Sequence, residues 1–180
     1  MPQHHAIPAT PDRMVWGYLD AAIPPVLHVE SGDTVTLRAL PAGGLPFLPA
    51  DRSLVPPEYL AALEALVQGP GARIVTGPVH VRGAMRGDAL QVDILKAEPT
   101  MDWGFVSIMP LLGTLPEEFT EYETIHPRID RARGTCALPW GTELPLSPSS
   151  ASSARRRRAN GAASPPTSRA PSAATWTIKS

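Results

Sequence analysis

Proline and glycine interrupt the sequence so often that a fold of long helices is excluded. Of the 180 residues, 22 are proline and 14 are glycine. Proline lacks the backbone N–H that a helix interior or a central strand requires, and glycine weakens both kinds of element. We therefore expect short strands joined by turns rather than a helical bundle.

Two segments alternate apolar and polar residues with the period of a β-strand. In residues 25–40 the alternation stands on both sides of a Ser-Gly-Asp turn, which predicts either a hairpin or two strands joined at a corner. Residues 72–99 contain two such strands, and a turn between them is expected at Gly87-Asp88. Both segments therefore predict β-structure.

Two further segments depart from this alternation. Residues 103–113 are almost uniformly apolar, which predicts a strand that is buried on both faces and ended by Pro110. Residues 56–69 begin with proline, carry Glu58 early, repeat leucine at helical spacing and end at Gly69, which predicts one helix. Together the four segments predict a mainly β fold, a β-sandwich or barrel-like core with one short helix.

The composition changes abruptly after residue 148. Residues 149–180 are rich in serine, alanine and arginine, and they contain six basic residues, including arginines 155–158, but no acid. All 17 acids therefore fall in residues 1–148, together with ten basic residues. A segment with so few bulky apolar side chains cannot offset the entropy cost of folding. We expect residues 1–148 to form the β domain and residues 149–180 to form a disordered tail.

No feature of the sequence indicates a membrane or an oxidising compartment. Cys136 is the single cysteine, so an internal disulfide is excluded. The first 20 residues lack the apolar run of a signal peptide or a membrane span. We expect a cytoplasmic protein with no membrane partner. The arginine run is a candidate nucleic-acid patch, but the tail offers only Trp176 for base stacking, which argues against a nucleic-acid partner.

The histidines stand in no recognised metal-binding spacing. His4 and His5 are near the N-terminus, whereas His28 and His80 lie inside alternating strands, where we interpret them as strand-face residues. No H-x-H, H-E-x-x-H or C-x-x-C pattern connects them. The residues alone therefore predict no metal ligand in this chain.

Three longer segments carry motifs in a specific order. They read HHAIPATPDRMVWGYLDAAIPPVLHVESGDTVTL, GPVHVRGAMRGDALQVDIL and DWGFVSIMPLLGTLPEEF. Their more specific parts are a His-x-x-x-x-Thr-Pro lead that starts at His5, the Trp16-Gly17 pair and the Asp102-Trp103-Gly104 triplet. In this order and spacing, the segments resemble the N-terminal half of the acetamidase/formamidase family over about residues 4–148.

The resemblance implies a function in nitrogen metabolism. Members of this family are β-rich cytoplasmic hydrolases that release ammonia from small linear amides such as formamide and acetamide. For the full-length proteins the resemblance also implies a divalent metal of the zinc or calcium type and a homo-oligomer. The family's polar Gly-Gly-Asn-Met-Asp and Gly-Asp-Gly-His motifs, which we expect to carry the metal site, lie beyond the region of resemblance. We therefore expect that this chain does not bind that metal.

Within residues 1–148, three residues are candidates for catalysis, Asp102, Asp33 and His5, and two are candidates for a substrate pocket, Trp16 and Trp103. Asp33 follows glycine in a turn, so a turn-forming carboxylate is the alternative. Asp102 precedes an apolar strand, where a capping role competes with a role in the site. For each tryptophan, the alternative is packing in the core.

The tail has a second interpretation. In the family, the chain continues with a strand of the type Phe-Phe-Gly-Val-Ile-Gly and later with Gly-Gly-Asn-Met-Asp-Ile-Lys. The codons of residues 149–154 permit the first of these when they are read one base earlier, and those of residues 173–177 permit Gly-Gly-Asn-Met-Asp. These matches indicate a frameshifted translation over residues 149–177, with the frame restored near Ile178. The alternative is a genuine disordered basic tail.

Three functions follow from these observations. The first is an amidase of the acetamidase/formamidase type, which we expect to be inactive in this truncated form. The second is a β-rich binding or scaffold module without chemistry. The third is a nucleic-acid binder that acts through its basic tail, and its affinity would fall steeply with salt.

Overall fold

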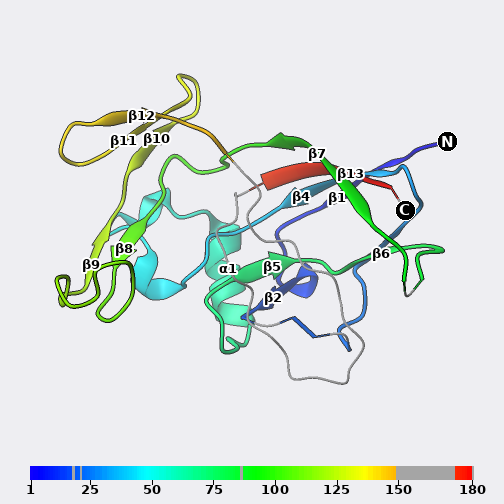
Figure 1. Ribbon diagram of the computed structural model, residues 1–180, viewed down its shortest axis with the longest axis horizontal. Helices are drawn as coiled ribbons and strands as arrows, with labels where there is room; N and C mark the ends of the chain where they lie inside the picture. The colour runs from blue at the N-terminus through cyan, green and yellow to red at the C-terminus, as the bar shows by residue number, and fades with distance from the viewer. Residues whose placement is uncertain (18, 21, 86, 149–172, 180) are drawn as a thin grey trace. The chain divides into compact units, whose positions relative to one another are not determined.

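The computed structural model describes residues 1–17, 19–20, 22–85, 87–148 and 173–179. The chain divides into two compact units (Figure 1). Unit 1 contains Met1–Gly44, Pro56–Pro99 and the C-terminal strand β13 (Ala173–Lys179), and unit 2 contains Leu45–Val55 and Thr100–Ser147.

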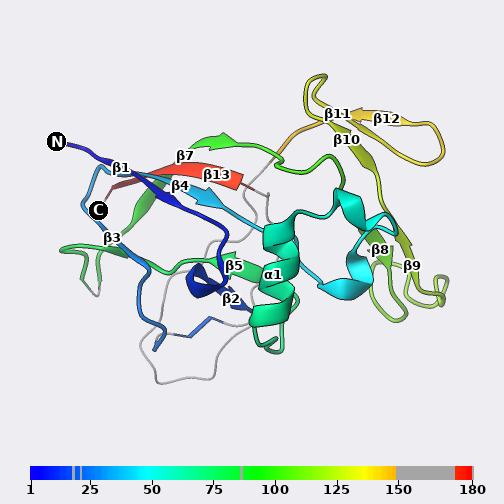
Figure 2. The ribbon, with the colours of Figure 1, turned by 180° about the vertical axis from the view of Figure 1, so that it is seen from behind.

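The largest sheet belongs to unit 1 and has four strands in the order β1-β4-β13-β7. β1 runs parallel to β4, with His4 opposite Thr34, and β13 runs antiparallel to both β4 and β7. Figure 2 shows these strands side by side from behind. The bounds of the other three strands are β1 His4–Ile7, β4 Thr34–Arg38 and β7 Gln91–Ala97.

Two strand pairs complete the β-structure of unit 1. β2 (Met14–Trp16) follows the 3-10 turn η1 (Pro11–Arg13) and pairs antiparallel with β5 (Ile74–Thr76). β3 (Leu27–Val29) pairs parallel with β6 (Val79–Val81). The main core lies between β1, β4, β3 and β6, because each contributes buried apolar side chains to it: Ile7, Val29, Val35, Leu37 and Val81.

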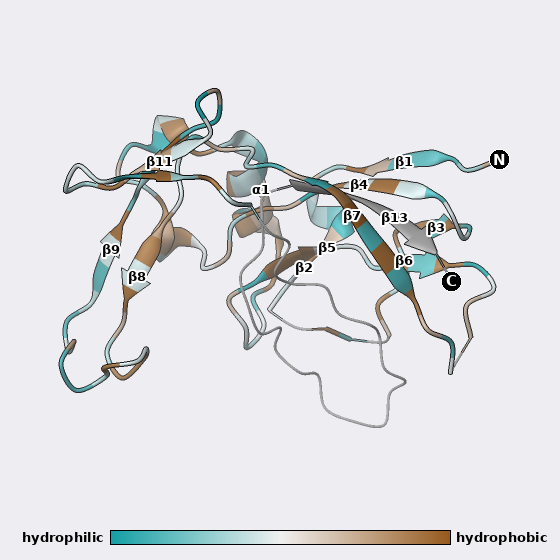
Figure 3. Cartoon of the chain, turned by 45° about the horizontal axis from the view of Figure 1, so that its top comes forward, coloured by the Kyte–Doolittle hydropathy of each residue, from teal (hydrophilic) through white to brown (hydrophobic). Residues whose placement is uncertain are grey.

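The alternation in the sequence predicts these strands but does not reveal their partners. Residues 25–40 form two strands joined at a corner, not a hairpin, because β3 pairs with β6 while β4 pairs with β1 and β13. The two strands predicted in residues 72–99 likewise do not pair with each other, because β6 pairs with β3 and β7 pairs with β13. Figure 3 shows the alternation along β7 as brown and teal bands.

The helix α1 (Pro57–Ala65) is shorter than the predicted 56–69. It buries Tyr59 and Ala62 completely. Burial raises the pKa of the Tyr59 phenol to about 12. After the helix, the backbone N–H groups of Gly69 and Gly71 donate to the carbonyl oxygens of Trp16 and Gly17, at 2.9 and 2.8 Å. These bonds hold the segment beside the end of β2, so the helix cannot continue.

Unit 2 consists of short strands and two 3-10 turns, η2 (Leu45–Phe47) and η3 (Arg52–Leu54). Its small core buries four apolar residues: Leu48, Val55, Met101 and Trp103. The strands form one antiparallel pair, β8 (Val106–Ile108) with β9 (Glu123–Ile125), and one antiparallel sheet of β10 (Arg128–Asp130), β11 (Thr135–Ala137) and β12 (Glu143–Pro145).

The predicted strand within residues 103–113 is present as β8, but its predicted burial on both faces is wrong. Val106 is 45% exposed. Among the described strands, β8 pairs with β9 alone, in a two-stranded sheet. The flanking aromatic residue does pack in this unit, since the rings of Phe105 and Phe47 lie 4.9 Å apart.

The C-terminal segment differs from the expected disordered tail at Ala173–Lys179. These residues form β13, which pairs on one side with β4 and on the other with β7. Two open strand edges offer backbone partners to any extended segment, whatever its side chains, which explains why composition does not predict this strand. The rest of the predicted tail, residues 149–172 and Ser180, lies outside the described residues.

The predicted fold class is confirmed. Strands dominate the described residues, α1 is their one α-helix, and the sheets are open. No helix in the described part of the chain is long and apolar enough to cross a membrane.

Two glycines with similar backbone angles provide a test of the packing beside β2. Gly17 has φ of +89° and Gly32 has φ of +93°, but a Cβ on Gly17 would lie 2.5 Å from the carbonyl oxygen of Gly71, whereas a Cβ on Gly32 would meet nothing within 4 Å. Gly32→Ala should cost about 1–2 kcal/mol of the free energy of unfolding, from backbone strain alone. Gly17→Ala should cost at least about twice as much, since the backbone must also move. Chemical unfolding followed by circular dichroism measures both, and equal losses would contradict the close approach.

Candidate functional site

Polar groups from three segments of unit 1 meet at Asp33, which precedes β4. Asp33 stands after Gly32 in the predicted turn, and its backbone N–H donates to the Glu30 carbonyl oxygen at 3.2 Å. The residue is 4% exposed, and it is the one buried charged residue among the described residues. A buried carboxylate requires hydrogen-bond partners, and these define the site.

Both oxygens of the Asp33 carboxylate accept hydrogen bonds. The backbone N–H of Gln3 donates to Oδ1 at 2.8 Å, and the backbone N–H of Glu30 donates to Oδ2 at 2.9 Å. His5 Nε2 also lies 3.0 Å from Oδ2. The two backbone donors, followed by His5, lower the pKa of Asp33 to about 2 against the opposing effect of burial. Asp33 is therefore an anion at neutral pH.

The imidazole of His5 is oriented by this carboxylate. An ionised carboxylate only accepts hydrogen bonds, so Nε2 carries the proton of the bond and Nδ1 remains as the acceptor nitrogen. Nδ1 has no hydrogen bond within the described part of the chain. The side chain is 21% exposed. Chemically, this is a histidine held in one tautomer by an aspartate, an arrangement that can take up a proton at Nδ1.

The third catalytic candidate, Asp102, belongs to unit 2, whereas His5 and Asp33 belong to unit 1. Its side chain is 65% exposed, and Arg131 Nε donates to Oδ1 at 2.7 Å. Its carbonyl oxygen accepts from the Ile129 N–H at 2.9 Å. An exposed ion pair of this kind contributes little to stability.

Both tryptophan candidates occupy core positions, the alternative that the sequence left open. Each is 6% exposed. Trp103 Nε1 donates to the Leu54 carbonyl oxygen at 2.9 Å. Trp16 Nε1 is buried and has no hydrogen-bond partner within the described part of the chain. Neither tryptophan lines the two cavities described next.

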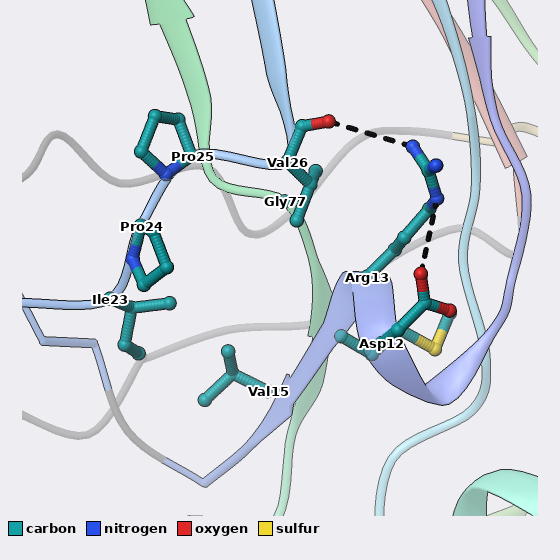
Figure 4. A pocket seen from close by; sticks show the side chains of 9 residues that line it. Asp12, Arg13, Val15, Ile23, Pro24, Pro25, Val26 and Gly77 are labelled. Atoms are coloured by element: carbon teal, nitrogen blue, oxygen red, sulfur yellow. Dashed lines mark hydrogen bonds and ion pairs between the residues drawn. The ribbon is translucent and has the colours of Figure 1, made fainter.

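Unit 1 has an open cavity of about 450 Å³ beside η1 and β2. Figure 4 shows its apolar wall of Ile23, Pro24 and Pro25 and the guanidinium of Arg13. Arg13 Nε lies 3.5 Å from the Asp12 carboxylate, so the cavity presents a neutralised cation. In unit 2, a cavity of about 480 Å³ lies along residues 118–123 and Ile108. None of the five candidate site residues lines either cavity.

The described residues do not fit a divalent metal of the kind that the resemblance implies. They contain no group of three or more histidine, cysteine, aspartate or glutamate side chains placed to hold one ion. At the His5 and Asp33 pair, moreover, both carboxylate oxygens already accept backbone N–H groups. We therefore derive no chemical step through a metal at this pair.

One pair of polar residues was missed by sequence reasoning. His28 on β3 lies directly opposite His80 on β6. The two residues are far apart in the sequence, so no spacing motif could connect them. The available signal is the matching pattern Leu-His-Val and Val-His-Val, an outward histidine between inward apolar residues in each strand.

No family model matches the sequence, and no curated protein matches it. Solved structures do match. A predicted acetamidase/formamidase from the thermophile Thermoanaerobacter tengcongensis has a TM-score of 0.64 at 19% identity, over 84% of this chain and 44% of that chain. This chain has the acetamidase/formamidase fold.

Two further acetamidase structures resemble this chain in fold. The acetamidase from Bacillus halodurans has a TM-score of 0.57 at 22% identity, over 83% of this chain and 44% of that one. The acetamidase from Yersinia enterocolitica has a TM-score of 0.57 at 20% identity, over 84% of this chain and 46% of that one. The chain thus spans less than half the length of the acetamidase structures it resembles.

The pKa of Asp33 predicts the acid sensitivity of unit 1. Because this pKa is lowered from 3.8 to about 2 in the folded chain, the ionised side chain stabilises the fold above about pH 4, and the contribution is lost as the pH falls through 2. Asp33→Asn should be less stable than the wild type at pH 6. The difference between the two proteins should shrink between pH 4 and pH 2.

Urea unfolding at several pH values measures this difference. Asp12→Asn provides a matched control, because Asp12 is exposed in its contact with Arg13. A stability gap between Asp33→Asn and the wild type that stays constant down to pH 2 would show that Asp33 titrates normally.

Proposed function

We propose that this chain is part of an amidohydrolase that cleaves the carbon–nitrogen bond of small linear amides, such as formamide and acetamide, and releases ammonia. The likeness to acetamidase/formamidase structures over 83 to 84% of the chain is the observation that supports the proposal. A γ-lactamase from Delftia acidovorans also matches, with a TM-score of 0.51, and its name again denotes a hydrolase of a carbon–nitrogen bond.

Amide hydrolysis requires a nucleophilic water, donors that stabilise the developing oxyanion, and an acid that protonates the departing nitrogen. The His5 and Asp33 pair can supply the proton transfers. Asp33 holds the Nε2 proton of His5, so Nδ1 can accept a proton from water and return it to the leaving nitrogen. We assign the stabilisation of the oxyanion to the part of the acetamidase structures that this chain does not span.

Asp33 serves as a positioning residue in this proposal. Its carboxylate does not contact substrate, since both of its oxygens bond to Gln3, Glu30 and His5. It keeps His5 in one tautomer and balances the positive charge that the imidazole acquires with a proton.

We further propose that the 180-residue chain is inactive because its reading frame is shifted over residues 149–177. The codon matches to two family segments support this proposal. Over most of residues 149–177, a shifted frame replaces the residues of the family with unrelated ones. The chain also covers only 44 to 46% of the length of the acetamidase structures.

The purified chain should release no ammonia from formamide or acetamide above background, with or without added divalent metal. A gene in which the frame is restored across residues 149–177 and continues downstream should encode an active enzyme. A coupled glutamate dehydrogenase assay measures the ammonia. Hydrolysis by the unrepaired chain would show that the catalytic groups lie within it, and a folded but inert repaired protein would show that the substrate class is wrong.

In the repaired enzyme, His5→Gln should lower kcat by about 10²- to 10⁴-fold, the range for loss of a general base. Asp33→Asn should lower kcat and shift its pH profile, because the positioning of His5 is lost. His4→Gln is the matched control, because His4 contacts the Thr36 hydroxyl and not Asp33. Equal kcat values for His5→Gln and His4→Gln would remove His5 from the reaction.

A further inference from the structure

The parallel pairing of β3 and β6 places two histidines side by side on one face. His28 is the direct partner of His80, and the following residues, Val29 and Val81, are partners in the same way. Val29 and Val81 are buried in the core of unit 1. Since successive side chains of a strand point to opposite faces, both imidazoles project from the outer face, and both residues are exposed.

The two imidazole rings already stand at the separation that a shared metal ion requires. Their centroids lie 5.1 Å apart, and their planes meet at 61°. A metal bound at about 2.0–2.1 Å to one nitrogen of each ring, with tetrahedral geometry, places the two centroids about 5 Å apart. Both side chains are exposed, so their rings can rotate to bring one nitrogen of each to the same ion without a change in the backbone.

Backbone bonds at both ends of the strand pair fix this arrangement. The Val26 N–H donates to the Pro78 carbonyl oxygen at 2.9 Å on one side of the histidines, and the Arg82 N–H donates to the Val29 carbonyl oxygen at 2.8 Å on the other. A one-residue slip of either strand would bury a histidine and expose a valine, so the register is strongly specified.

The surroundings of the pair leave its nitrogens available. Within the described part of the chain, neither His28 nor His80 makes a hydrogen bond. The next residues on the same face are Glu30 and Arg82, and Arg82 Nε lies 3.3 Å from the Glu30 carboxylate. These opposite charges neutralise each other, so no net positive charge at this position repels a cation.

We propose that His28 and His80 form a binding site for one borderline transition-metal ion, Cu²⁺, Ni²⁺ or Zn²⁺, on the outer face of β3 and β6. Imidazole nitrogen suits these ions, whereas Mg²⁺ and Ca²⁺ prefer oxygen ligands. Two protein ligands leave the remaining coordination positions to water. The site is separate from the metal that the resemblance implies for full-length acetamidases, and it does not depend on the proposed amidase activity.

Binding at this site links two strands that are distant in the sequence. The unfolded chain does not hold the two histidines together, so the ion binds the folded chain better and stabilises it. A chelated second imidazole also raises the affinity well above that of a single histidine, because its binding is intramolecular.

Titration of the 180-residue chain with NiCl₂ and with CuCl₂ in a calorimeter tests the proposal. One ion should bind per chain, and excess Ni²⁺ should raise the unfolding temperature. His28→Ala and His80→Ala should each weaken binding at least about tenfold and abolish the thermal shift. The double variant should bind more weakly than either single variant, because it also lacks the one imidazole that each single variant retains.

His4→Ala is the control for the other pair of neighbouring histidines, because His4 is exposed and near the N-terminus. It should bind Ni²⁺ like the wild type. Circular dichroism establishes that each variant is folded. If a variant fails to fold, electron paramagnetic resonance of Cu²⁺ in the His4→Ala protein should still show coupling to two imidazole nitrogens. Absence of binding by the wild type, or unchanged binding by His28→Ala, would overturn the proposal.

Discussion

The Asp33 carboxylate is the constraint on which unit 1 depends. Its two oxygens accept hydrogen bonds from Gln3, His5 and Glu30, and so join the segment before β1, β1 itself and the end of β3 at the start of β4. Among the described strands, β1 has one neighbour, β4, and stands at the edge of the sheet. Because a buried charge requires hydrogen-bond partners, these bonds favour the parallel register of β1.

The same bonds connect stability with the proposed chemistry. The register of β1 against β4 places Ile7 opposite Leu37, and both side chains belong to the buried core. The same register brings His5 to Asp33. A change that loosens this corner therefore affects the core and the orientation of the histidine together.

The sequence predicted local structure well because alternation is a local signal. β3 and β4 both lie in residues 25–40, and the one helix begins within a residue of its predicted start. Pairing is long-range, and no periodicity encodes it. For this reason the corner between β3 and β4 remained an alternative to a hairpin, and the contact of His28 with His80 was missed. The early end of α1 likewise depends on distant partners, the carbonyl oxygens of Trp16 and Gly17.

The candidate site was predicted only in part. His5 was a candidate from the motif that starts at it, and Asp33 was a candidate within a turn. Neither feature predicts that the two side chains contact each other. Asp102 was a candidate because it precedes an apolar strand, and the structure exposes it and pairs it with Arg131. The burial of both tryptophans follows the general tendency of large aromatic side chains.

Amide hydrogen exchange at Gln3 and Glu30 tests the central role of Asp33 most directly. Both N–H groups donate to its carboxylate, and Gln3 precedes the first strand. If the carboxylate holds this corner, both amides should exchange as slowly as those of β4, and both should lose this protection in Asp33→Asn. Exchange of the Gln3 and Glu30 amides at the rate of an unstructured peptide, while β4 remains protected in the wild type, would contradict the account.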